Sequence, residues 1–286
     1  MRKLLALLLV LLPVAGFAQV LLLPEIPDYL QNESDRTEFL LLHYWDNYDF
    51  QDPSVFVEGD ATLGYFYVMS ECSYEASDES IKSTLQKASK NDRIFSLFID
   101  TYRVYLFNQE SYFCDYERYL AVTEFVINDE KINEYAKYDF LLEKQIIEAN
   151  RIGDKATDFI VFDKNGNQIE LFNIDSEYLI LFFNNPDCGI CMKTKDNLAN
   201  SEIINSLEDT GNLKVFAICP YNEQELWEAT MYPDKWINGY DKIQRINNER
   251  LYYLLESSSI YLLDKNKKVL KKDIRFDLLE EYLKCL

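Results

Sequence analysis

Two cysteines separated by two residues, Cys188 and Cys191, lie where an apolar run gives way to a helical pattern. The run YLILFF at 178–183 has the length and composition of a buried central strand. A turn over 184–187 follows, and the sequence from Cys188 onward predicts a helix. This order of strand, turn, CxxC and helix constrains the fold most, because it places a cysteine at a helix N-terminus beside a sheet.

The sequence after residue 150 predicts an α/β domain. Alternating apolar residues surround Asn165-Gly166, a strong hairpin signal, and a second hairpin is expected around 265–267. A further buried strand is predicted at 213–219, and helices are expected near residue 222 and at the C-terminal end. Strands that alternate with helices indicate a layered α/β architecture over 151–286.

The preceding region, 19–150, predicts an all-α domain with Ser34 as the first helix cap. Apolar residues recur there at helical spacing. The expected helical segments are 34–50, 60–76, 78–89, 93–107, 116–128 and 132–150.

The first 18 residues predict a secretory signal peptide. Arg2 and Lys3 precede nine apolar residues at 4–12, and small residues occupy the −3 and −1 positions of a cut before Gln19. The other reading is a buried N-terminal helix. With the signal peptide removed, we expect an exported chain without stable membrane insertion, because no later apolar stretch approaches a membrane span.

Composition excludes some partners. The chain has 49 acidic and 29 basic residues, a formal net charge of −20, so nucleic acid and anionic lipid should repel it. Six cysteines are too few for a disulfide scaffold in 286 residues, so each cysteine needs its own explanation. An exported compartment permits disulfides.

The position of the CxxC favours a working dithiol. A helix N-terminus stabilises a thiolate, so we expect Cys188 to attack and Cys191, about one turn on, to resolve the mixed disulfide. Zinc would need further cysteine or histidine ligands, which the sequence does not supply, and an inert disulfide is the other alternative. We expect no metal and no cofactor. The single histidine, His43, is expected to be packed or hydrogen-bonded, which argues against Ser-His-Asp and Cys-His catalysis.

Residues 151–286 resemble the TlpA-type thioredoxin-like thiol–disulfide oxidoreductases, through the stretches RIGDKATDFIVFDKNGNQIEL, LILFFNNPDCGIC and SIYLLDKNKKVLKKD. The segments RTEFLLLHYWDNYDF and EANRIGDKATDF resemble a helical domain of unknown function that precedes such domains in secreted proteins of Bacteroides-type bacteria. The resemblance implies a periplasmic protein with Cys188 as nucleophile and Cys191 as resolving cysteine. Its implied partners are protein thiols and disulfides and a membrane or periplasmic electron donor.

The sequence departs from this family in three places. Ser257 and Ser258 stand where the family's substrate-docking loop has Thr-Pro with a cis proline, and a cis bond before serine costs about 3 kcal/mol, so a trans bond is expected. Asp187, which follows Pro186, stands where an aromatic is often found, and both residues are expected to modulate the dithiol. Phe182 replaces the buried acid of thioredoxin, so the proton of Cys191 must go to another group or to water.

Asp187 also bears on redox direction. A carboxylate beside Cys188 opposes its thiolate, which lowers the reduction potential and favours a reducing or isomerising role. A potential near about −120 mV, that of a strong dithiol oxidant, would contradict this.

Two other functions compete with an oxidoreductase. A non-catalytic protein-interaction module with a degenerate thioredoxin-like scaffold is favoured by the missing proline. A thiol peroxidase would need Pro and Thr where the chain has Leu181 and Asn185.

The remaining cysteines stay open. Cys72 and Cys114 either pair or are simply buried, Cys219 is a third redox partner or a buried spectator, and Cys285 is expected to be a spectator. Lys193 and Lys195 either raise the potential of the dithiol or form a solvated helix face.

Overall fold

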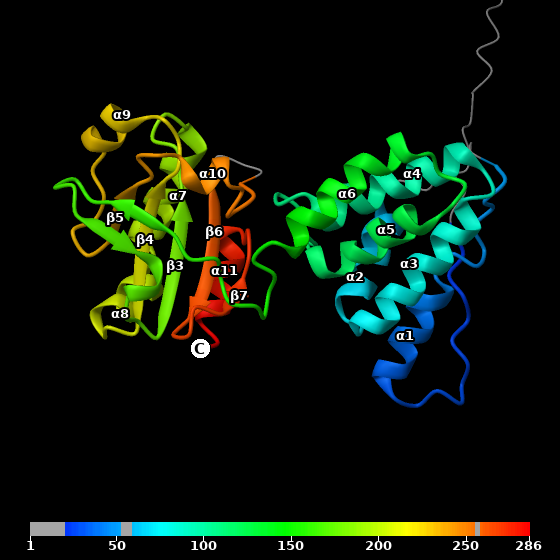
Figure 1. Cartoon of the computed structure of the whole chain (residues 1–286). Coiled ribbons are helices and arrows are strands. Elements are labelled where there is room, and N and C mark those ends of the chain that lie inside the picture. Colours follow the sequence, from blue (N-terminus) through cyan, green and yellow to red (C-terminus); the bar gives the residue numbers. More distant parts are fainter. Residues whose placement is uncertain (1–20, 53–58, 255–257) are drawn as a thin grey trace, which may run out of the picture. The chain divides into compact units, whose positions relative to one another are not determined.

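A computed structural model describes residues 21–52, 59–254 and 258–286, and the predicted signal peptide lies outside them. The chain packs as two compact units, of which the first ends at Arg103 and the second spans Val104–Leu286. Figure 1 labels the α-helices of both units and the strands β3 to β7. The domain boundary predicted between residues 150 and 151 stays a prediction.

The first unit is helical, as the sequence predicts. Its described helices are α1 (Glu33–His43), α2 (Asp60–Ser70), α3 (Tyr74–Ala88) and α4 (Asp92–Tyr102). Asn32, and not the expected Ser34, caps α1 by accepting the Ser34 N–H at 2.9 Å. The helix expected over 60–76 ends at Ser70, and a new helix, α3, starts after Ser73, whose side chain caps it.

The core of the first unit is aromatic. Trp45, Tyr65, Phe98 and Tyr102 are almost fully buried and meet edge to face or tilted, with ring centroids 5.2–6.4 Å apart. The Tyr65 hydroxyl lies 2.9 Å from the Ser80 hydroxyl and 3.0 Å from that of Tyr102, so both buried phenols are hydrogen-bonded.

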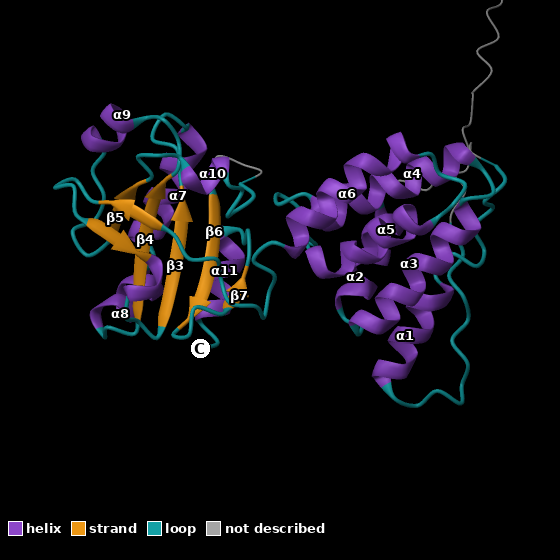
Figure 2. Cartoon of the chain, viewed as in Figure 1, coloured by secondary structure: helices purple, strands orange, loops and turns teal. Residues whose placement is uncertain are grey.

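The second unit begins with helices and continues as a sheet. A short π-helix (Arg103–Phe107) leads to α5 (Tyr116–Asn128) and α6 (Glu134–Glu148), which Asp115 and Asn133 cap. The all-α prediction for the N-terminal part is therefore confirmed. Figure 2 shows every described strand in the part of the chain after these helices.

The sheet has seven strands in the order β2-β1-β5-β4-β3-β6-β7. β3 runs parallel to β4, and β4 to β5, while all other pairs are antiparallel. The strands are β1 (Ile160–Phe162), β2 (Gln168–Glu170), β3 (Tyr178–Phe183), β4 (Leu213–Cys219), β5 (Ile237–Tyr240), β6 (Ser259–Asp264) and β7 (Val269–Lys271).

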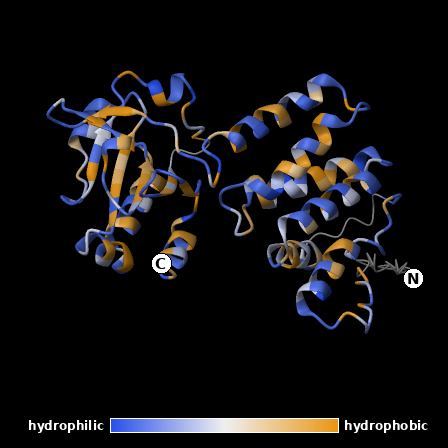
Figure 3. Cartoon of the chain, turned by 60° about the horizontal axis from the view of Figure 1, so that its bottom comes forward, coloured by the Kyte–Doolittle hydropathy of each residue, from blue (hydrophilic) through white to orange (hydrophobic). Residues whose placement is uncertain are grey.

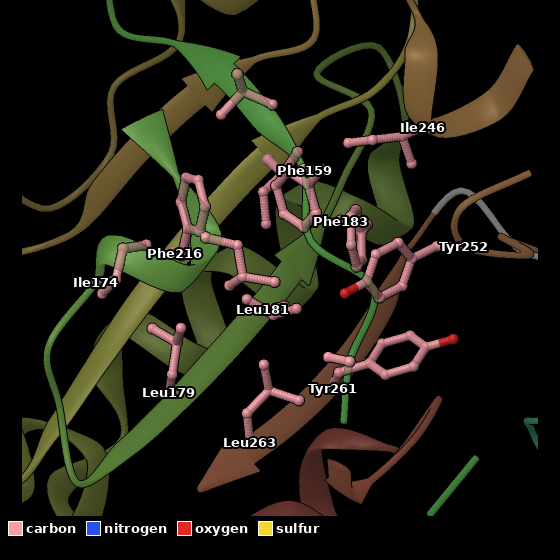
Figure 4. Packing of buried hydrophobic residues seen from close by; sticks show 14 of the residues in the cluster. Phe159, Ile174, Leu179, Leu181, Phe183, Phe216, Ile246, Tyr252, Tyr261 and Leu263 are labelled. Carbon is pink, nitrogen blue, oxygen red and sulfur yellow. The ribbon is translucent and has the colours of Figure 1, made fainter. Parts of the chain in front are cut away.

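β3 is buried on both faces, as its apolar run predicts. Leu181 and Phe183 pack on one face in the cluster drawn in Figure 4, and Ile180 and Phe182 pack on the other. Figure 3 shows the apolar residues gathered along the central strands. The turn that carries the CxxC follows directly after the C-terminal end of this buried strand.

Five helices are described after β3, between and beyond the remaining strands. Leu198 of α7, Ile204 of α8 and Leu279 of α11 share one core cluster with β3 residues on one face of the sheet. The bounds are α7 (Gly189–Asn200), α8 (Glu202–Asp209), α9 (Gln224–Ala229), α10 (Arg245–Asn248) and α11 (Phe276–Leu283). The helix expected after the CxxC is thus two helices, because Ser201 ends α7 and caps α8.

Lys272, which follows β7, links the sheet to α6. Its ammonium group donates hydrogen bonds to the carbonyls of Ile146, Ile147 and Ala149, at 2.6, 3.2 and 2.5 Å. A cation at a helix C-terminus satisfies carbonyls that lack intrahelical partners and complements the helix dipole. Arg151 also pairs with Glu117 of α5. The Lys272 contacts thus join the C-terminal end of α6 to the residue after β7 within the second unit.

Candidate functional site

Cys188 occupies the N-cap of α7. Its sulfur accepts the backbone N–H of Cys191 at 3.3 Å, and the residue is half-buried. An N-cap side chain lies among the unsatisfied N–H groups of the first turn, at the positive end of the helix dipole. Both effects stabilise a thiolate over a thiol.

Cys191 has the opposite environment. It is fully buried, and the Asn185 N–H donates to its sulfur at 3.4 Å. Burial, followed by the hydrogen bond to Cys188, raises the pKa of the Cys191 thiol to about 12. Cys191 therefore holds its proton at pH values where an N-cap thiol can ionise.

The turn before the dithiol is held by its own side chains. Asn185 accepts the backbone N–H of Cys188 with its carbonyl at 3.0 Å and that of Asp187 with Oδ1 at 2.9 Å. Asp187 is exposed and Pro186 half-buried. The influence of both residues on the dithiol stays a prediction. Phe182 is buried in the core beneath the turn.

Below the dithiol, Asn184 joins the ends of β3 and β4. Its amide donates to the carbonyls of Phe182 and Ile218, each at 3.2 Å, and its oxygen accepts the Tyr232 hydroxyl at 2.7 Å. Burial raises the pKa of Tyr232, and charge on Cys219 or Cys191 raises it further. Tyr232 is therefore near both cysteines.

Cys219 ends β4 at the same edge of the sheet as the CxxC, because β3 and β4 are parallel. It is fully buried, and burial raises the pKa of its thiol to about 11. Its sulfur donates weakly to the Tyr221 carbonyl at 3.8 Å. These properties fit a buried spectator better than an exposed redox partner.

A pocket of about 400 Å³ opens beside Cys188. Ser258 lines it, so the structure brings one of the two predicted docking residues to the dithiol, whereas Ser257 lies outside the described residues. The peptide bond into Ser258 starts at Ser257, so its predicted trans state stays a prediction. The other lining residues are Gln109, Glu110, Ile190, Lys193, Thr194, Asn197, Ile260, Asp273, Ile274, Arg275, Phe276 and Asp277.

Asp273 is an unusual residue among those that line the pocket. It is 5% exposed and has a φ of +49°, a left-handed conformation that only Gly and, less often, Asn or Asp adopt without strain. The Ser259 hydroxyl donates to its Oδ1, its Oδ2 is buried, and the Tyr116 hydroxyl lies close enough to stabilise the carboxylate. Burial raises the pKa of the Asp273 carboxyl to about 6.

One wall of the pocket comes from far back in the chain. We call Gln109–Glu110, in the loop before α5, the pocket wall. The Arg275 guanidinium donates to the Glu110 carbonyl at 2.9 Å while it also pairs with Asp277. The Gln109 amide donates to the Tyr116 hydroxyl at 3.3 Å.

Sequence reasoning did not find Asp273, Arg275, the pocket wall or Asn184. The first three meet Cys188 only through tertiary packing, and no local motif marks them. Asn184 had one usable signal, since a polar residue directly after a buried strand must satisfy its amide at the sheet edge.

The structure also places His43 and the two lysines of α7. His43 is hydrogen-bonded, with Nδ1 2.7 Å from Asp46 Oδ2, and its ring lies 4.3 Å from that of Phe39. Lys195 pairs with Asp196 and donates to the Met231 carbonyl, whereas Lys193 lines the pocket.

Within the described ranges no cluster of three or more potential metal ligands occurs. Among the same residues, no helix is both long and apolar enough to cross a membrane. Cys72 and Cys114 belong to different compact units, so their pairing stays a prediction.

Comparisons with known proteins agree with this architecture. Residues 14–150 match a domain of unknown function, DUF5106. The crystal structure of a thioredoxin-like protein from Bacteroides caccae ATCC 43185 is 32% identical, with a TM-score of 0.86, and the match covers 93% of this chain and 99% of that one.

Two further solved structures match the second half. A C-terminal domain of an uncharacterized protein from Bacteroides fragilis NCTC 9343 is 38% identical, with 48% of this chain and 99% of that chain covered and a TM-score of 0.47. A thiol:disulfide interchange protein from Bacteroides sp. is 22% identical, with 47% and 89% covered and a TM-score of 0.41. None of the curated proteins compared matches the chain.

Proposed function

This chain belongs to the family of thioredoxin-like proteins, and on that premise we propose that it is an exported thiol–disulfide oxidoreductase. It exchanges disulfides with protein substrates through Cys188 and Cys191. The observation that carries the proposal is the asymmetry of the pair: a half-buried cysteine at a helix N-cap next to a fully buried one with a raised pKa. Export rests on the pattern of residues 1–18.

The exchange has two steps. The Cys188 thiolate attacks one sulfur of a substrate disulfide, the substrate S–S bond breaks, and the leaving thiolate takes a proton from solvent. Cys191 then loses its proton and attacks the Cys188 sulfur, which releases the second substrate thiol. Two electrons pass to the substrate and the Cys188–Cys191 disulfide forms. A membrane or periplasmic dithiol donor must reduce it again.

The burial of Cys191 supports the isomerising part of the reducing or isomerising role. Burial raises the pKa of the Cys191 thiol, which disfavours the thiolate that the second step requires. No carboxylate contributes to the pKa of Cys191, in keeping with Phe182 on the central strand. A slow second step lets the mixed disulfide persist, and a persistent mixed disulfide gives a bound substrate time to rearrange its own disulfides.

The test is the equilibrium reduction potential of the pair, measured by thiol trapping in glutathione and dithiothreitol buffers with Cys188→Ala as the control. We expect a reversible two-electron couple below about −200 mV. A couple near about −120 mV would reverse the direction of the proposed enzyme.

The second candidate is a non-catalytic interaction module. The presence of Ser258, and not a proline, beside Cys188 favours it, because the loop that docks a substrate backbone is altered. This candidate predicts no accessible redox couple for the pair, so the same titration separates the two functions.

A further inference from the structure

The pocket beside Cys188 has features that the exchange reaction itself does not require. Thiol–disulfide exchange needs an accessible thiolate and a resolving thiol. Here the pocket also has a buried carboxyl group, Asp273, and a wall contributed by Gln109–Glu110. Both restrict what can approach Cys188.

The charge of the pocket is negative. Its ionisable side chains include three acids, Glu110, Asp273 and Asp277, and two bases, Lys193 and Arg275. Arg275 makes two hydrogen bonds to the carboxylate of Asp277, which neutralises that pair. The remaining groups favour a positively charged ligand, and the chain's net charge of −20 adds long-range attraction.

Asp273 is the strongest of these groups because it is buried. Charges in a low-dielectric wall are screened less than charges in water. The groups that face its carboxyl are Ser259, Tyr116, Cys114, Tyr261 and Lys272. Of these only Lys272 carries a positive charge, and its ammonium group is already bonded to three carbonyls of the α6 terminus. The Asp273 charge is therefore incompletely compensated.

The pocket wall limits size. The Glu110 carbonyl is bonded to Arg275 across the pocket, and Gln109 is bonded to Tyr116 at the start of α5, so both residues of the wall are held in place. A volume of about 400 Å³ lies in the range of pockets that bind small molecules, and it is too small to admit a folded protein surface. A short extended stretch of polypeptide fits such a space, and a rigid folded surface does not.

We propose that this pocket selects substrate cysteines in flexible, cationic polypeptide segments, with the pocket wall excluding folded surfaces and Asp273 supplying the preference for positive charge. This inference rests on the proposed oxidoreductase function and names its substrate class. In the reaction the Cys188 thiolate attacks the substrate sulfur while basic neighbours of that cysteine lie in the field of Asp273.

The experiment uses two short synthetic peptides, each with one cysteine in a mixed disulfide with 5-thio-2-nitrobenzoate. Lysines flank the cysteine in one peptide and aspartates in the other. Attack by Cys188 on the peptide sulfur releases the coloured thiolate, and each rate is divided by the rate of the same peptide with dithiothreitol. We expect the reduced protein to prefer the lysine peptide by about fivefold or more at pH 7.

Asp273→Asn should lower this ratio by at least half, while the smaller preference due to the chain's net charge remains. Asp196→Asn, which removes an equal charge from the exposed face of α7 outside this pocket, should keep it. If Asp273→Asn does not fold, wild-type protein at pH 5.5 replaces it. Asp273 is largely protonated there, whereas both Lys272 and the peptide aspartates keep the charges they have at pH 7.

A wild-type ratio near one at pH 7, or a preference that Asp273→Asn lowers by less than half, would overturn the inference while leaving the oxidoreductase intact. If neither peptide reacts, the proposed function fails, and binding decides the inference. Serine analogues of both peptides are then titrated by fluorescence anisotropy. A lysine preference that Asp273→Asn lowers by at least half would uphold the charge selection, and an unchanged preference, or equal or absent binding, would overturn it.

Discussion

Each of the two compact units buries a cluster of polar side chains, and the two clusters differ in charge. In the first unit, the hydroxyls of Tyr65, Tyr102 and Ser80 hydrogen-bond one another, and Ser80 also donates to the Leu41 carbonyl at 3.0 Å. In the second unit, Ser259 donates to Asp273, whose buried carboxyl has Tyr116 and Lys272 as its other stabilising neighbours.

The difference separates a structural cluster from a functional one. Neutral hydroxyls that satisfy one another stabilise a fold, and burial raises the pKa of Tyr65 and Tyr102, which keeps them neutral. A buried, incompletely compensated carboxylate costs stability. Such a cost is typical of active sites, and Asp273 lines the pocket of Cys188.

The largest expected effect is a gain in stability from Asp273→Asn. Because burial raises the pKa of Asp273 to about 6, ionising it at pH 7.5 costs the folded state about 2–3 kcal/mol, and the neutral amide avoids most of that cost. Hydrogen exchange followed by mass spectrometry on peptides from β3 and β6 should show slower exchange in the variant. Faster exchange would mean that Asp273 is a structural residue.

The same carboxyl predicts a pH dependence. Its pKa is about 6 in the folded state and about 3.9 in the unfolded chain, so the folded state binds more protons between these values. Wild-type stability from this group therefore rises as the pH falls through 6 and levels off below about 4. From pH 7.5 to pH 5 the advantage of Asp273→Asn should shrink by about 1 kcal/mol. A constant advantage would exclude ionisation as its cause.

Tyr65→Phe should have the opposite sign. Removing its hydroxyl leaves Tyr102 and Ser80 with one hydrogen-bond partner fewer, which lowers the stability of the first unit by about 1 kcal/mol. Exchange of peptides from α2 and α4 should speed up equally at pH 5 and pH 7.5, and the activity of the dithiol should not change. A stabilised variant would remove the contrast between the two clusters.

The smallest expected effect concerns the pocket wall. Arg275→Met removes the hydrogen bond to the Glu110 carbonyl, so alkylation of Cys188 by iodoacetamide should become a few-fold faster, an effect below about 1 kcal/mol. Arg245→Met, which removes an exposed pair with Glu249, is the matched control and should leave the rate unchanged. An unchanged rate in Arg275→Met would show that the wall does not limit access.

Most elements of the fold could be predicted from local sequence patterns. The apolar run of β3, the turn at Asn165-Gly166 and the CxxC at a helix start are each local, and each was predictable. β5 was not, since Ile237–Tyr240 contains a glycine and lacks alternation. It joins the sheet because Gly239 has no side chain: a Cβ there would lie 2.3 Å from a methyl group of Val161.

The candidate site divides in the same way. The spacing of Cys188 and Cys191 made them predictable as a redox pair. Their position at a helix start explains why Cys188 is partly exposed and Cys191 is buried. Asp273 and Glu110 are surface-type residues in sequence, and only the packing of the loop before α5 against the β7–α11 connection places them beside Cys188. Pairings between segments so distant in sequence carry no signal in a single chain.

The central claim is that Cys188 attacks and Cys191 resolves. The most direct test incubates a disulfide-bonded substrate protein with the Cys191→Ser and Cys188→Ser variants and separates the products without reductant. A mixed disulfide should accumulate with Cys191→Ser, because the second step is blocked, and none should form with Cys188→Ser. Accumulation with Cys188→Ser instead, or with neither variant, would contradict the assignment of the two cysteines.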